Sequence, residues 1–352
     1  MTSLFDPLVA GELHFPNRIL MAPLTRNRST GDGRVPNELM RQYYVQRASA
    51  GAILTEATSV TPAGVGYPHT PGIWSREQTE GWRSIVEGVH QAGGRILLQL
   101  WHVGRISDPL YHNGGLPVAP SALAPKGTVS LLRPSRPYVV PRALALEEIP
   151  GVVEAFRQGA SNAKTAGFDG VEIHGANGYL LDQFLQDSTN HRTDRYGGSL
   201  ENRARLMLEV ADAVSSVWGA GRVGMHLAPR ADAHDMGDSN LGETFGYVAR
   251  ELGKRKLAFI CVRESEKTPR LGPQLKVAFG GVYIANEGFT QQSGEQALAV
   301  GEADAVAFGK LFIANPDLPR RFSEKREANA WNADTFYSQG SEGYTDYPAF
   351  AV

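Results

Sequence analysis

The stretch VEIHGANGYLLDQFLQ, residues 171–186, begins as a buried strand and ends as a helix. Three hydrogen-bonding side chains, His174, Asn177 and Tyr179, stand within six residues of one another where the strand gives way to the loop. Packing alone requires no polar side chain at such a boundary. Their clustering therefore marks this part of the chain as a candidate binding or catalytic site.

The same change from strand to helix recurs along the whole chain. Short apolar runs rich in β-branched residues are followed by amphipathic stretches, and strands that are apolar on both faces are typical of parallel sheets. We expect Ser199 to cap the N-terminus of the helix in the last of these amphipathic stretches, 199–219. The predicted strands are 18–24, 52–57, 95–101, 170–175, 223–228, 257–262, 281–286 and 304–309, and the clearest helical stretches are 37–51, 76–94, 146–168 and 199–219.

Eight strands that alternate with helices predict an α/β fold, the (β/α)8 TIM barrel. The main alternative is an open doubly wound sheet, which opens with a glycine-rich phosphate turn, and no G-x-G-x-x-G follows the first strand. A barrel of this kind commonly reaches 352 residues as one domain. We therefore expect a single domain over 1–352, in which the Pro- and Gly-rich segment 102–145 forms an excursion over the barrel mouth.

Composition excludes several classes of function. The formal net charge is −2, which gives no electrostatic reason to expect nucleic acid or a membrane as partner. Cys261 is the only cysteine, so the chain has no intrachain disulfide and no cysteine-cluster metal site. The N-terminus has no basic region before an apolar run, and no stretch approaches the ~20 apolar residues of a membrane span. These features predict a cytoplasmic globular protein.

Active sites of such barrels lie at the C-terminal ends of the strands. Uncharged donors and aromatic rings dominate those ends here, which suits a flat heterocycle with polar edges better than a metal or a sugar. Phosphate sites commonly use the loops after strands seven and eight, where Gly309 allows close backbone approach and Lys310 supplies charge. The side chains at the predicted strand ends are Pro23, Leu24, Thr25, Glu56, Ala57, Gln99, Trp101, His102, His174, Asn177, Tyr179, His226, Asn286, Gly309 and Lys310.

The segment HGANGYLLDQFLQDSTNHRTDRYGGSLENRARL, residues 174–206, resembles the signature of the Old Yellow Enzyme family of FMN-dependent ene-reductases. MAPLTRNR, QLWHVGR, FGKLFIANPDLPRR and EGYTDYP are similar to other landmarks of that family, and together the matches cover nearly the whole chain. The resemblance implies a barrel filled by non-covalent FMN, with NAD(P)H as electron donor. It also implies ping-pong reduction of activated C=C bonds in α,β-unsaturated carbonyls, maleimides and nitroalkenes.

The resemblance also assigns roles to individual residues. His174 and Asn177 are expected to bind the activating oxygen of the substrate, and Tyr179 to donate the proton. Tyr67, Trp101 and Tyr337 are expected to line the substrate pocket. The residues expected to contact FMN are Thr25, Gln99, Pro23, Ala57 and His226 at the ring, and Asn286, Gly309 and Lys310 at the phosphate.

Physical chemistry accounts for this constellation. Hydride that reaches the β-carbon pushes charge onto the carbonyl oxygen, and two aimed donors stabilise it, each by roughly 3–4 kcal/mol. A phenol such as Tyr179 keeps its proton at pH 7 yet can give it to a carbanion-like carbon.

The chain departs from the family at two cationic positions. The family more often has Arg where His226 and Lys310 stand, and imidazole, unlike guanidinium, can be neutral. A nearby arginine, Arg230, could compensate for the first change. Asn177 is one of two family variants, the other being His.

Other enzyme classes fit less well. A metal-dependent hydrolase could use His102, His174, His226 and His234, but the chain lacks H-x-H at strand one and a carboxylate at a convincing strand end. A Schiff-base aldolase needs a lysine in the barrel mouth, where only Lys310 is near. A flavin-binding protein without activity remains the non-catalytic alternative. The sequence leaves open the physiological alkene, the choice between NADPH and NADH, and whether the protein is a monomer or a homodimer.

Overall fold

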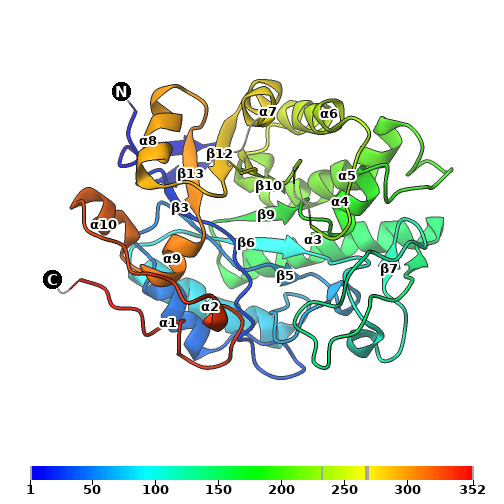
Figure 1. The fold of residues 1–352 in the computed structure, drawn as a ribbon, viewed down its shortest axis with the longest axis horizontal. Helices are drawn as coiled ribbons and strands as arrows, with labels where there is room; N and C mark the ends of the chain where they lie inside the picture. The colour runs from blue at the N-terminus through cyan, green and yellow to red at the C-terminus, as the bar shows by residue number, and fades with distance from the viewer. Residues whose placement is uncertain (1, 231–232, 266–268, 351–352) are drawn as a thin grey trace.

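The computed structural model describes residues 2–230, 233–265 and 269–350. Within them, eight parallel strands close into a barrel with helices on its outside, as Figure 1 shows. The closing contact joins the second strand of the barrel, β4, to the third, β6. The barrel strands in chain order are β3 (Ile19–Met21), β4 (Ile53–Leu54), β6 (Ile96–Trp101), β9 (Gly170–His174), β10 (Val223–Leu227), β11 (Phe259–Arg263), β12 (Val282–Asn286) and β13 (Ala305–Phe308). The (β/α)8 prediction is confirmed.

The strands are shorter than their apolar runs. β6, β9 and β10 are buried along their whole length, as expected for strands covered on both faces. Seven of the eight strands lie inside the predicted ranges. The exception is β11, which continues to Arg263, one residue past the predicted end, and this residue proves important for the site.

Several of the helices on the outside of the barrel begin at a side chain that caps them. Asn37, Ser75 and Ser199 each accept the N–H of the residue three positions later, so the expected cap at Ser199 is confirmed. The helices are α1 (Glu38–Val45), α2 (Arg76–Gln91), α3 (Ile149–Ala166), α4 (Leu180–Leu185), α5 (Leu200–Trp218), α6 (Leu241–Lys254), α7 (Gly272–Phe279), α8 (Gln291–Ala299), α9 (Lys310–Ala314) and α10 (Leu318–Ser323). No helix within the described ranges has the length and apolar character needed to cross a membrane.

An antiparallel hairpin that the sequence analysis did not predict precedes the barrel. It consists of β1 (Leu8–Ala10) and β2 (Leu13–Phe15), which are too short for a clear periodic signal. Alternate residues of both strands are buried and pack with barrel-interior residues such as Leu20, Leu97 and Phe259. The hairpin therefore covers one end of the barrel core, and the strand-end site lies at the other.

The excursion 102–145 contains the helical turn Pro109–His112 and two very short paired strands, β7 (Val118–Ala119) and β8 (Arg142–Ala143). Arg192 ties it to the segment after α4 by donating to the carbonyl oxygens of Pro120 and Leu144. The charged stretch around Arg192 thus anchors neighbouring loops.

The chain end returns to the barrel. Figure 1 shows the C-terminal segment, in red, running past α9 toward α1. Tyr344 stacks on Tyr43 of α1 with ring centroids 4.0 Å apart. Arg26 donates to the carbonyl oxygens of Phe336 and Gly343, and Arg28 to those of Thr335, Gly340 and Glu342. These bonds bring Tyr337 to the barrel mouth.

Candidate active site

The turn after β9 directs three side chains into the barrel mouth. Asn177 and Gly178 are both left-handed, with φ of 56° and 75°, a conformation that asparagine and glycine tolerate best. A Cβ atom at Gly178 would lie 2.7 Å from Met236 Cγ and 2.9 Å from His234 Cβ, so the turn also needs glycine for space. The double turn separates His174, at the end of β9, from Tyr179, at the start of α4.

Two polar residues of α4 hold this turn. Asp182 Oδ2 accepts the N–H of Gly178 at 2.8 Å, and Gln183 Nε2 donates to the Gly178 carbonyl at 2.7 Å. Both side chains are buried, and burial raises the pKa of Asp182 to about 7. The polar residues in the middle of the helical stretch therefore secure the backbone that presents Asn177 and Tyr179.

A cavity of about 660 Å³ opens at the strand ends, within the usual volume of cofactor and ligand pockets. We call it the strand-end cavity. Its wall is built mainly from the residues that follow β3, β12 and β13, together with inward-facing side chains of β6, β9, β10 and β11. The lining residues are Ala22–Thr25, Gln99, His174, Asn177, His226, Arg263, Asn286–Thr290, Ala307–Leu311, Ile313, Trp331, Phe336 and Tyr337.

A second cavity of about 610 Å³, the loop cavity, lies beside the first and shares Thr25 and Tyr337 with it. Its wall comes from loops rather than strand ends, including the tip of the excursion. The lining residues are Thr25, Tyr67, Thr128–Leu131, Arg133, Ser135, Tyr179, His234 and Tyr337.

Most of the residues predicted for the site border one of these cavities. The strand-end cavity has Pro23, Thr25, Gln99, His174, Asn177, His226, Asn286, Gly309, Lys310 and Tyr337, and the loop cavity has Tyr67 and Tyr179 in addition to the shared pair.

Two predicted residues, Ala57 and Trp101, border neither cavity. Trp101 is buried behind the tyrosines instead. Its ring lies 5.5 Å from that of Tyr67 and 5.0 Å from that of Tyr179, measured between centroids. In this arrangement Trp101 supports the wall that the tyrosines form.

A buried carboxylate beneath the strand-end cavity was not predicted. Glu172 Oε2 accepts from Gln99 Nε2 at 2.7 Å, and Glu172 Oε1 lies 3.4 Å from His226 Nδ1. Glu172 thereby fixes both side chains, leaving His226 Nε2 and the remaining amide groups of Gln99 free for a ligand. The available signal was its position two residues before His174, on the same inward face of a fully buried strand.

The structure does not support the metal-hydrolase alternative. His102 borders neither cavity, and burial together with His112 lowers its pKa to about 3. The ligand atoms of Glu172, His226 and Cys261 do lie within 4.8 Å of one another. However, Glu172 already bonds Gln99 and contacts His226, and burial raises the pKa of the Cys261 thiol well above its ordinary value, which disfavours the thiolate that binds metal.

His174 is a neutral donor. Its Nδ1 accepts the N–H of Ala176 at 3.3 Å, so the ring proton lies on Nε2. Burial, followed by the neighbouring His226 and Arg263, holds the pKa of His174 well below its ordinary value. The imidazole therefore offers an N–H without a charge.

Arg263, the residue missed at the end of β11, orients Asn177. Its Nη1 donates to Asn177 Oδ1 at 2.9 Å, and its Nη2 pairs with Glu287 at 3.0 Å. Because a guanidinium has no acceptor, the oxygen of the Asn177 amide must face Arg263. The amide N–H₂ group is then available as a donor to the cavity.

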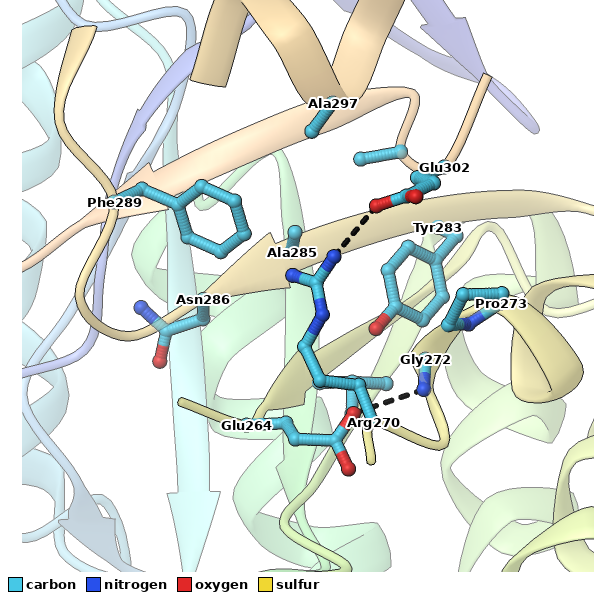
Figure 2. Close-up of a pocket in the computed structure, with 12 residues that line it drawn as sticks. Glu264, Arg270, Gly272, Pro273, Tyr283, Ala285, Asn286, Phe289, Ala297 and Glu302 are labelled. Atoms are coloured by element: carbon cyan, nitrogen blue, oxygen red, sulfur yellow. Dashed lines mark hydrogen bonds and ion pairs between the residues drawn. The ribbon is translucent and has the colours of Figure 1, made fainter. Parts of the chain in front are cut away.

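Glu264, the residue after Arg263, serves a small pocket elsewhere. Figure 2 shows Glu264 beside Gly272, and Arg270 reaching to Glu302. The carboxylate accepts the N–H groups of Leu271 and Gly272 and pairs with Arg230 at 3.2 Å. The cavity between these side chains is only about 10 Å³, so the side chains nearly fill it. Arg230 is thus engaged with Glu264, and it does not replace a cation at His226.

Comparison with known proteins agrees with this geometry. Residues 3–329 match the model of the NADH:flavin oxidoreductase / NADH oxidase family. The chain is 42% identical to 12-oxophytodienoate reductase 2 of Arabidopsis thaliana over 98% of this chain and 95% of the relative. It is 43% identical to putative 12-oxophytodienoate reductase 4 of Oryza sativa subsp. japonica, over 98% of this chain and 92% of that protein.

Solved structures agree with this assignment. The old yellow enzyme homologue from Zymomonas mobilis superposes with a TM-score of 0.96 at 45% identity, over 99% of each chain. Morphinone reductase in complex with tetrahydroNAD gives 0.96 at 46% identity, over 100% of this chain and 98% of the other. The chain therefore belongs to the NADH:flavin oxidoreductase / NADH oxidase family, within the Old Yellow Enzyme group, and is an NAD(P)H-dependent flavin oxidoreductase.

Proposed function

We propose that this protein is an FMN-dependent ene-reductase that reduces activated C=C bonds of α,β-unsaturated carbonyls, maleimides and nitroalkenes in a ping-pong cycle. The observation that carries the proposal is the pair of uncharged donors, His174 Nε2–H and the Asn177 amide, held beside a protonated phenol, Tyr179. The hydrogen bonds from Ala176 and Arg263 fix the orientation of both donors.

The strand-end cavity fits non-covalent FMN. The free groups of Gln99, His226 and Thr25 suit the polar edge of a flat ring, and Pro23 and Ala57 are assigned backbone contacts to it. At the far end, Gly309 and the exposed Lys310 suit a phosphate, close to the loop that Asn286 braces by donating to the Ala307 carbonyl at 2.8 Å. When bound, FMN supplies the hydride chemistry that links NAD(P)H to the alkene.

The side chains do the rest. His174 and Asn177 donate to the carbonyl or nitro oxygen of the substrate, where charge develops as the β-carbon is reduced. Tyr179 then gives its proton to the α-carbon. Burial raises the pKa of this phenol, so it keeps its proton until a carbanion-like carbon takes it. Tyr67, Trp101 and Tyr337 shape the pocket around that carbon.

The test uses the purified protein. We expect a yellow protein that releases one FMN per chain into the supernatant on acid precipitation and that oxidises NAD(P)H when an enone is added. FAD in the supernatant, or flavin retained on the pellet, would contradict the cofactor assignment. If no enone, maleimide or nitroalkene increases the rate at which the FMN-loaded protein oxidises NAD(P)H, the ene-reductase assignment is wrong.

The remaining assignments belong to the same proposal. We place the whole chain, 1–352, in one FMN-binding domain with 102–145 as its cap. The protein acts in the cytoplasm on small-molecule alkenes, as a monomer or homodimer, without a nucleic-acid or membrane partner.

A further inference from the structure

Three side chains form a row along the wall of the loop cavity. The hydroxyl oxygens of Tyr67 and Tyr179 are 2.9 Å apart, and Tyr67 Oη lies 3.4 Å from His234 Nε2. The three residues come from different parts of the chain: Tyr67 precedes α2, Tyr179 immediately precedes α4, and His234 lies in the connection between β10 and α6. All three border the loop cavity.

The backbone fixes the direction of these hydrogen bonds. His234 Nδ1 lies 2.7 Å from the carbonyl oxygen of Asn177, and a carbonyl can only accept. The proton of the neutral ring therefore sits on Nδ1, and Nε2 presents a lone pair to Tyr67. The Tyr67 hydroxyl can donate to that lone pair while its oxygen accepts the proton of Tyr179.

The loop that carries His234 is held in an uncommon conformation. His234 and Asp235 are both left-handed, with φ of 60° and 58°. Arg105 donates to the carbonyl oxygens of both residues at 3.0 and 3.2 Å, and Lys126 pairs with Asp235 at 3.1 Å. The excursion, through Arg105 and Lys126, therefore keeps the His234 ring against the tyrosines.

Apart from the hydrogen bond with Tyr67, the contacts of Tyr179 are made mainly by its ring. The ring of Tyr179 packs edge-on against Trp101 and His174, each with a centroid distance of 5.0 Å. Among the described residues, the Tyr67 hydroxyl is the hydrogen-bond partner that the structure gives to the Tyr179 hydroxyl. The half-buried His234 lies one step further along the same cavity wall.

We propose that Tyr67 and His234 form a relay that returns a proton to Tyr179 after each reduction, with water in the loop cavity as the source. This inference rests on the proposed function, because it requires Tyr179 to lose a proton in each cycle. In the relay both residues act through Tyr179; Tyr67 also lines the proposed substrate pocket, whereas His234 is assigned no contact with the substrate.

The steps balance in protons and charge. The O–H bond of Tyr179 breaks as the α-C–H bond of the substrate forms, which leaves a phenolate. Tyr67 passes its hydroxyl proton to that phenolate and receives one from His234 Nε2. His234 has taken that proton from hydronium or a buffer acid in the cavity and returns to its neutral form. One solvent proton is consumed for each alkene reduced.

The acidities favour transfer toward Tyr179. Burial raises the pKa values of the Tyr67 and Tyr179 phenols above their ordinary value. Burial, then the charges of Arg105 and Arg263, lower the pKa of His234, against the hydrogen bond to Asn177 that raises it. An imidazolium at His234 is thus a stronger acid than either phenol, and a phenolate at Tyr179 draws the proton inward.

The experiment compares His234→Gln with the wild-type holoenzyme. The glutamine amide can still donate to the Asn177 carbonyl but cannot carry a proton. We expect NAD(P)H to reduce the flavin at the wild-type rate, a tyrosinate absorbance that persists after one enone is reduced, and steady-state turnover that falls roughly tenfold or more. Added imidazole should restore turnover in proportion to its protonated form. His191→Gln, a change at an exposed histidine away from both cavities, should behave as wild type.

Two outcomes would overturn the relay. His234→Gln with wild-type turnover shows that water reaches Tyr179 directly. Slow turnover without tyrosinate and without imidazole rescue shows that His234 only supports the loop. Wild-type enzyme that fails to reduce enones at all removes the proposed function itself, so the two failures are distinguishable.

Discussion

The two cavities of this protein share a wall but are held in different ways. The strand-end cavity is lined by side chains that the barrel sheet fixes, and Glu172 locks Gln99 and His226 from beneath. The loop cavity is lined by segments far apart in the chain, such as the excursion tip and the loop around His234, which arginine side chains tie together. Rigid elements set one site precisely, while loops set the other.

This difference separates two tasks. The proposed cofactor contacts lie at strand ends, where their geometry follows from the topology of the sheet. Of the proposed substrate and proton contacts, Tyr67, Tyr179 and His234 lie in the loop cavity, whereas His174 and Asn177 border the strand-end cavity. Changes in the loop cavity are therefore expected to alter the reaction with the alkene and to leave cofactor binding intact. The predictions that follow test this separation, beginning with the largest expected effect.

Tyr179→Phe should give the clearest separation. Removing the hydroxyl deletes the proton donor, so enone reduction should slow by roughly 100- to 10,000-fold, while NAD(P)H still reduces the flavin at nearly the wild-type rate. Nitroalkenes should be affected less, because a nitronate is stable enough to take its proton from solvent. Stopped-flow measurement of both half-reactions checks this. Equal slowing of the two half-reactions, or unchanged enone reduction, contradicts the assignment of Tyr179.

His174→Ala tests a residue that borders the strand-end cavity but is assigned to the substrate. Loss of one donor to the developing negative charge should cost roughly 3–4 kcal/mol in enone reduction, with weaker binding of phenolic ligands and full retention of FMN. Asn177→Ala should have an effect of the same kind. The measurements are oxidative half-reaction rates, ligand titrations and flavin content. A colourless His174→Ala protein would show that His174 chiefly binds the cofactor and not the substrate.

Arg263→Met should have a smaller effect, because it acts through Asn177. Without the guanidinium the Asn177 amide can rotate, and we expect roughly a tenfold loss in enone reduction, about 1.4 kcal/mol. A double-mutant cycle with Asn177→Ala checks the route: in that background Arg263→Met should change little. Glu287→Gln, which alters only the other partner of Arg263, is the matched control, and its loss in the rate of enone reduction should be smaller. Additive losses in the cycle would show that Arg263 acts independently of Asn177.

Asp182→Asn should affect stability rather than chemistry. The pKa of Asp182 in the folded protein is about 7, above the ordinary 3.8, so the folded state keeps a proton that the unfolded state releases. The free energy of unfolding should therefore fall as pH rises from 3.8 to about 7, by up to about 1.4 kcal/mol per pH unit from this group, and level off above. In the variant, the free energy of unfolding measured with urea should depend less on pH over this range. Glu56, whose pKa burial also raises to about 7, stays in the variant and retains its own share of the slope.

An unchanged slope in Asp182→Asn would show that the pKa of Asp182 is not raised in the folded protein. Flavin content and enone reduction at pH 7 serve as controls for the fold of the variant.

The strand-end cavity was predictable because the barrel topology places every strand end at one mouth. Gln99, His226 and Lys310 were identified in this way before any contact was known. Glu172 and Arg263 were missed, since their roles depend on partners 73 and 86 positions away in the chain. Local periodicity carries no information on such pairs.

Of the residues that line the loop cavity, Thr25 and Tyr179 were predicted from the strand ends, whereas Tyr67 and Tyr337 were predicted only through resemblance to a family. Tyr67 and Tyr337 lie in segments without regular secondary structure, so no pattern of strands and helices places them. His234 was considered only as a metal ligand, although its ring faces Tyr67. The hairpin before the barrel was missed for a simpler reason, because strands of three residues give no clear alternation.

The hydrogen bonds from Arg26 and Arg28 to the C-terminal segment have a consequence for the evolution of such a protein. Both side chains are almost fully buried, and nearly all of their bonds to that segment go to carbonyl oxygens, which every amino acid supplies. Apart from Tyr344, whose buried ring packs against Tyr43 and both arginines, attachment of the segment therefore depends little on which residues it carries. Tyr337 and its neighbours can be replaced to admit an alkene of a different shape while the C-terminal segment stays attached. The substrate range can therefore change in evolution without loss of the fold.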